Sequence, residues 1–109
     1  MRFLAALILT SPLLASANPV DGNMDALITN LGLGARQAEA QAACERDAPS
    51  VKLLHDPSIA RYCLVRHGAP RKQALFLGVQ LSAEFAKEGR GDASDAIDKL
   101  VDVLEQRTD

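Results

Sequence analysis

The stretch DPSIARYCLVRHGAP, residues 56–70, carries both the start and the stop signals of one helix. Asp56 is a favourable N-cap residue, and Pro57 suits the first helical position because the N–H that proline lacks has no helical partner there. Gly68 stands where many helices end in a left-handed residue, and Pro70 follows closely, as proline often does after a helix end. The stretch therefore predicts a short helix between the two prolines.

The patterns on either side of this short helix, which we expect over residues 57–67, are also helical. A first helical region is expected from about Met24 to Arg46, with a kink or short break at the LGLG sequence of residues 31–34 because glycine disfavours helix interiors. A helix over residues 70–87 has a wide apolar face and is expected to be the central one, and Asp92 is expected to cap the last helix. The fold class predicted is all-α, a small compact bundle of four to five helices.

The N-terminus has the three parts of a secretory signal peptide. Arg2 is followed by the mostly apolar stretch Phe3–Leu14 and by the small residues Ala15-Ser16-Ala17. This apolar stretch is shorter than the roughly 20 residues that span a bilayer, so a membrane anchor is the weaker interpretation. We expect residues 1–17 to be removed, leaving residues 18–109 as a single helical domain, exported to the periplasm or secreted, without a membrane span.

Two cysteines, Cys44 and Cys63, lie in the predicted mature chain. In an exported protein an even pair indicates a disulfide, and a domain of this size gains from such a covalent link. The alternative is two free buried thiols. We predict a Cys44–Cys63 bond that joins the end of the first helical region to the middle of the short helix.

The sequence LVRHG, residues 64–68, resembles the phosphate-site motif of the histidine phosphatase superfamily. That resemblance would imply an α/β domain in which His67 accepts the phosphoryl group and Arg66 binds its oxygens. The family's histidine follows a strand near the start of the domain and needs a second histidine downstream. Here the segment has helix signals, and the other histidine, His55, precedes it. We interpret the match as fortuitous and predict no enzyme activity.

The remaining polar residues do not form a familiar catalytic or metal-binding pattern. The spacing of Cys44, His55, Cys63 and His67 matches no zinc-site signature, and we predict no metal and no cofactor. Nor does the chain contain a basic run interleaved with aromatic residues, as single-stranded nucleic-acid sites do. We therefore expect no nucleic-acid partner.

Charge is distributed unevenly along the chain. Residues 57–83 contain four basic and no acidic residues, whereas residues 84–109 contain eight acidic and four basic ones. The favoured explanation is that helix faces neutralise each other within the fold, and the alternative is a basic patch that meets an acidic partner. The candidate protein-contact face consists of Arg61, Tyr62, Arg66, His67, Arg71 and Lys72.

These observations lead to a functional expectation by elimination and architecture. We expect a small exported protein without enzyme activity that acts by binding another protein, as inhibitors, immunity proteins and chaperones or adaptors do. The alternative is a small-ligand carrier or an undetected enzyme with a pocket near Tyr62 and His67.

Overall fold

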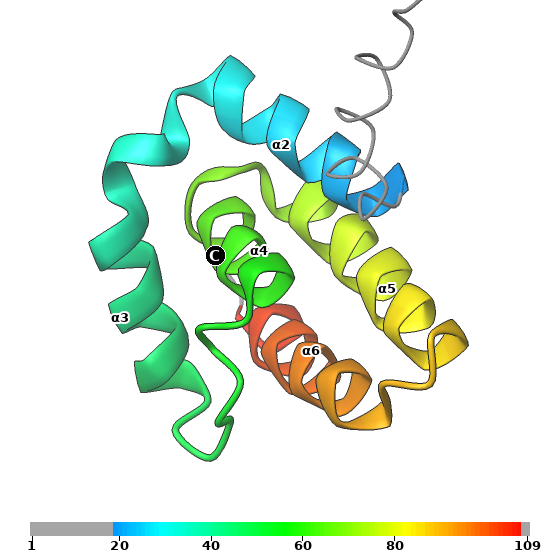
Figure 1. Cartoon of the computed structure of the whole chain (residues 1–109). Coiled ribbons are helices and arrows are strands. Elements are labelled where there is room, and N and C mark those ends of the chain that lie inside the picture. The colour runs from blue at the N-terminus through cyan, green and yellow to red at the C-terminus, as the bar shows by residue number, and fades with distance from the viewer. Residues whose placement is uncertain (1–18, 108–109) are drawn as a thin grey trace, which may run out of the picture.

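The computed structural model describes residues 19–107, and this part of the chain is a compact all-α bundle without strands (Figure 1). The predicted signal segment, residues 1–17, lies outside the described residues. The elements in chain order are α2 (Pro19–Leu31), the 3₁₀ helix η1 (Leu33–Arg36), α3 (Gln37–Asp47), α4 (Pro57–Gly68), α5 (Arg71–Lys87) and α6 (Gly91–Glu105). The predicted fold class is confirmed.

The short helix α4 lies at the centre of the bundle, and the other helices surround it (Figure 1). Its residues from Tyr62 to Arg66 are all buried, as is Ile59. The middle of α4 is therefore buried on every side, whereas the helices around it have one buried and one solvent-exposed side. Our expectation that α5 is the central helix is wrong, because the outer side of α5 faces solvent.

Both ends of α4 lie where the local signals place them. The C-terminal end, however, does not have the left-handed glycine that was predicted. The Asp56 carboxylate accepts a hydrogen bond from the Ser58 backbone N–H at 3.0 Å, and Pro57 occupies the first turn. Gly68 is the last helical residue and is not left-handed. Glycine relieves crowding there instead, because a Cβ at this position would meet the end of the Leu33 side chain and force it to shift.

The LGLG sequence breaks the first helical region, which is one of the two outcomes expected there, a kink or a short break. Gly32 has φ of 64°, the left-handed conformation that glycine adopts without strain, and it separates α2 from η1. The break turns the chain so that α2 and α3 pack on different sides of α4 (Figure 1).

Helices α5 and α6 form an antiparallel hairpin joined at Gly89, which has φ of 80°. Gly78 of α5 permits a close approach to both α6 and α4, because a Cβ there would collide with the Val101 side chain of α6 and would lie 2.5 Å from the Tyr62 hydroxyl oxygen of α4. Asp92 lies in the first turn of α6, and Arg90 is the N-cap, so the predicted cap position is two residues too late. The Asp92 carboxylate still accepts a hydrogen bond from the Ala93 backbone N–H at 2.7 Å.

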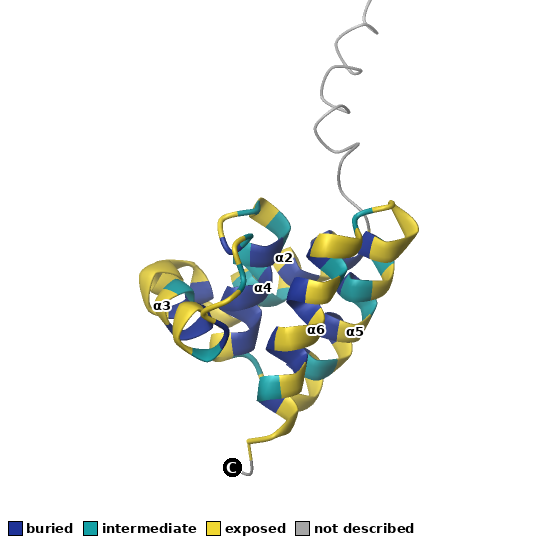
Figure 2. Cartoon of the chain, turned by 90° about the horizontal axis from the view of Figure 1, so that it is seen from below, coloured by how far each residue is buried: buried dark blue, intermediate teal, exposed yellow. Residues whose placement is uncertain are grey.

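The predicted Cys44–Cys63 disulfide is present and joins α3 to α4. The two Cα atoms are 6.1 Å apart, within the usual range for a disulfide, and both residues are buried. Figure 2 shows the resulting arrangement, with buried residues on the inward sides of the helices and exposed residues outside. None of the helices in residues 19–107 is long and apolar enough to cross a membrane.

Candidate interaction surface

The predicted contact face does not exist as a surface, because its central residue Tyr62 is fully buried. The Tyr62 hydroxyl donates a hydrogen bond to the Ala74 carbonyl oxygen at 2.8 Å, which fastens α4 to α5. Burial raises the pKa of this hydroxyl well above its ordinary value, so it stays protonated. Since Tyr62 has no exposed surface, it cannot line a pocket that is open to solvent, and the alternative of a ligand or enzyme pocket near Tyr62 and His67 gains no support from it.

Arg66 is also inside the protein, with 2% of its side chain exposed. Its Nη2 lies 2.9 Å from an Asp47 carboxylate oxygen, and its Nε donates to the Leu100 carbonyl oxygen at 3.2 Å. Asp47 also pairs with Arg107. Arg66 thus connects α4 with the end of α3 and with α6, and it is unavailable to a partner protein.

Two further basic residues bind groups of the same chain. The Arg71 guanidinium donates to the carbonyl oxygens of Glu105 at 2.9 Å and of Leu104 at 3.4 Å, both in the last turn of α6. Arg61 donates from Nε to Asp25 at 2.7 Å and lies 3.4 Å from Asp21. These contacts support the favoured explanation of the charge asymmetry, neutralisation within the fold.

The last two residues of the predicted face lie near the end of α4 and the start of α5. The Nε2 of His67 lies 3.5 Å from a Glu39 carboxylate oxygen. The pKa of Glu39 is lowered, mainly by its hydrogen bond and ion pair with Arg36 and to a smaller extent by His67. Lys72 is exposed. With Tyr62 and Arg66 buried, the six predicted residues do not form one contact surface.

The structure also bears on the resemblance to histidine phosphatases. Residues 64–68 lie in the last turns of α4 and not on a strand. Arg66 points to Asp47, so it does not frame a phosphate site around His67. Among residues 19–107, no group of three or more His, Cys, Asp or Glu side chains is arranged to hold a metal ion.

A polar cleft of about 330 Å³ lies at the start of α4, but most of its charged side chains bind groups within the cleft. Arg90 donates to Asp56 at 2.8 Å, Ser58 donates to Asp21 at 3.0 Å, and Arg61 also approaches Asp21. This set of contacts holds together α2, α4 and the turn before α6. We assign it to the stability of the bundle.

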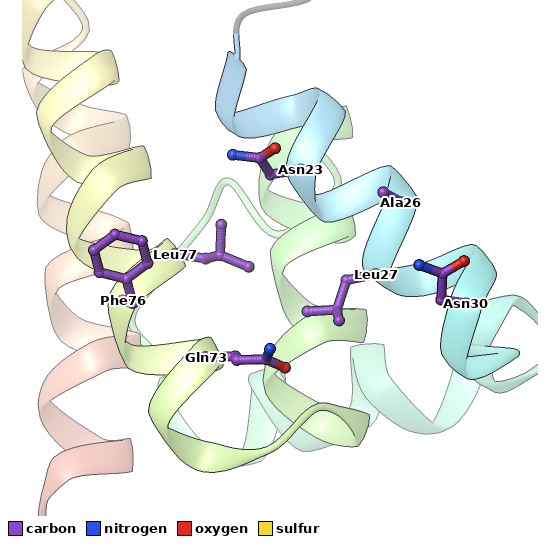
Figure 3. Close-up of a pocket in the computed structure, with 7 residues that line it drawn as sticks. All are labelled: Asn23, Ala26, Leu27, Asn30, Gln73, Phe76 and Leu77. Atoms are coloured by element: carbon purple, nitrogen blue, oxygen red, sulfur yellow. The ribbon is translucent and has the colours of Figure 1, made fainter.

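A groove of about 250 Å³ between α2 and α5 has a different character, since none of the residues that line it is charged (Figure 3). Leu27 of α2 and Leu77 of α5 point into the space between the two helices (Figure 3). Carboxamide side chains and the Phe76 ring complete the lining. The residues concerned are Asn23, Ala26, Leu27, Asn30, Gln73, Phe76 and Leu77.

Large apolar side chains stand exposed beside this groove on α5. Phe76 is 63% exposed and Val79 is 61% exposed. They are three residues apart on one helix and therefore neighbours on its surface. Protein interfaces are depleted of charge at their centre and enriched in aromatic residues, which is the composition found here. We call the groove-lining residues together with Val79 the α2–α5 face.

Sequence reasoning missed the α2–α5 face because Phe76 and Val79 belong to the wide apolar face of the helix expected over residues 70–87, and that helix was expected to lie at the centre of the bundle. One signal was available: residues 73–83 form a run without any charged residue, longer than one buried helix side requires. Ala74, Gly78, Leu81 and Phe85 account for the inward side.

No family model, curated protein or solved structure matches the chain.

Proposed function

We propose that this is a small exported protein without enzyme activity that acts by binding another protein, and that the α2–α5 face is its contact surface. The single observation that carries the proposal is the exposed Phe76 ring at the edge of an uncharged groove. Exposed apolar patches of this kind are costly in water and often mark binding sites. The proposed site replaces the basic face predicted from the sequence.

The chemistry of the groove indicates what the partner presents. Leu27 and Leu77 offer an apolar floor, and the amide groups of Asn23, Asn30 and Gln73 can donate and accept hydrogen bonds. An uncharged partner segment fits this lining, whereas a strongly acidic one finds no opposite charge there. The disulfide is compatible with the oxidising compartment of an exported protein.

Site-specific photo-crosslinking tests the proposal. A benzophenone amino acid replaces Phe76 in one variant and Ala42, which is exposed on α3, in the control. In the native envelope or secreted fraction, we expect position 76 to give a crosslink to one foreign protein that position 42 does not give. A foreign protein captured equally from both positions, or from neither, would contradict the assignment of this face.

A further inference from the structure

The α2–α5 face carries both a projection and a hollow. The projection is the Phe76 ring, 63% exposed, and the hollow is the groove of about 250 Å³ beside it, with Leu27 and Leu77 on its floor (Figure 3). In a two-fold symmetric dimer both chains use the same surface patch. That patch must therefore contain both a projection and a hollow that can accept the projection of the other chain. This face meets that requirement.

We propose that a second copy of this chain covers the α2–α5 face and forms a two-fold dimer. Each Phe76 ring enters the groove of the other copy and packs against its Leu27 and Leu77. The exposed Val79 of each chain, one turn further along α5, extends the apolar contact. The inference goes beyond the proposed function because it concerns what covers the face when no foreign partner is bound.

Charge favours this face for self-association. The chain has a formal net charge of −2, so two copies repel each other where their charged groups meet. The residues that line the groove are uncharged, and so is the whole α5 run from 73 to 83. Two copies can therefore approach here without placing like charges against each other, an arrangement that would otherwise be costly.

The size of the face sets the expected affinity. The uncharged α5 run extends over roughly 16 Å of helix, at 1.5 Å per residue. A contact of this length belongs with small interfaces of less than about 1,200 Å² in total, which form weak or transient complexes. We expect a reversible dimer in the micromolar range. Because dimerisation covers the face, a foreign partner has to compete with the second copy.

Sedimentation of the purified, disulfide-bonded protein over a concentration range of about 1 µM to about 1 mM tests the dimer. We expect a monomer–dimer equilibrium that high salt does not weaken, since screening acts on charged contacts and not on apolar ones. Phe76→Ser should raise the dissociation constant at least tenfold. Ala42→Ser, on an exposed part of α3, is the matched control and should leave it unchanged.

A second measurement identifies the surface directly. Chains of normal and heavy isotopic composition are mixed, with a benzophenone amino acid at position 76, and crosslinked after irradiation. We expect crosslinks between light and heavy chains that map to α2 and α5. A monomer at every concentration, or a dimer insensitive to Phe76→Ser, would overturn the inference. Because only this chain is used, neither result depends on whether a foreign partner is found.

Discussion

Helix α4 and the outer side of α5 differ from what their residues suggest: the basic helix is mostly buried, and the apolar helix side is exposed. Helix α4 carries Arg61, Arg66 and His67, yet most of it is buried and its charges bind groups of the same chain. The outer side of α5 carries Phe76 and Val79, yet it faces solvent. The difference shows that a basic segment can be an internal connector. Conversely, an apolar segment can be a surface available for binding.

The largest expected effect tests whether Arg66 is an internal connector. Arg66→Met should reduce the free energy of unfolding by about 3 kcal/mol, because it removes the ion pair with Asp47 and the hydrogen bond to the Leu100 carbonyl oxygen inside the protein. We place the loss at the lower end for a broken buried pair because Arg107 still binds Asp47. Urea denaturation followed by circular dichroism measures the loss.

Lys72→Met is the matched control, since Lys72 is exposed in the first turn of α5. Removing an exposed charge should change the free energy of unfolding by less than about 0.5 kcal/mol. Equal effects of the two substitutions would mean that Arg66 is not held inside the protein.

An effect of similar size is expected for the covalent link from α3 to the buried helix. Replacing both Cys44 and Cys63 by alanine should lower the free energy of unfolding by roughly 3 kcal/mol, because the unfolded chain loses a closed loop of about 20 residues. Chemical denaturation of the two proteins gives the difference. A double variant as stable as the native chain would show that packing alone fastens α3 to α4.

A smaller effect distinguishes the inner side of α5 from its outer side. Gly78→Ala should cost about 1–3 kcal/mol, because the added Cβ would lie 2.5 Å from the Tyr62 hydroxyl oxygen. Thermal unfolding measures the change.

Gly22→Ala serves as the counterpart in α2, where a Cβ meets nothing within 4 Å. It should stabilise the protein by about 0.5–1 kcal/mol through helix propensity. A neutral Gly78→Ala variant would mean that α5 can move away from α4 without loss.

The smallest effect lies at the exposed end of α4, where Glu39 meets Arg36 and His67. The pKa of Glu39 is lowered in the folded protein, with Arg36 as the main cause. A carboxylate with a lowered folded-state pKa stabilises the fold above its unfolded-state pKa, and this contribution disappears as pH falls through the folded-state pKa. In an NMR titration, Arg36→Ala should raise the pKa of Glu39 more than His67→Ala does. The reverse order would contradict the assigned cause.

Local signals were sufficient where a feature depends on residues close in sequence. Asp56 and Pro57 define the start of α4, and Gly32 supplies the left-handed break, because caps and glycine conformations are properties of a few consecutive residues. The disulfide also followed from the sequence, since Cys44 and Cys63 are the two cysteines of the chain. The local rules failed at Gly68, where the constraint is a distant side chain, Leu33.

Whether a charged or apolar side chain is buried or exposed depended on which helices pack against each other. Arg66 is buried because the end of α3 brings Asp47 to it and α6 brings a carbonyl oxygen, and residues 47 and 100 are far from it in sequence. Phe76 is exposed because α2 packs against α4 and leaves a groove beside α5.

The sequence by itself therefore determined the all-α class, the bounds of α4, the interruption near Gly32 and the disulfide. It placed the start of the first helix at Met24, five residues after the observed start at Pro19. The packing of α2, α3 and α6 around α4 decided which residues form the surface. The physical reason is that burial depends on the sum of contacts from several helices, whereas helix formation depends mainly on neighbouring residues. The candidate site depends on which side chains are buried and which are exposed, so only the tertiary structure revealed it.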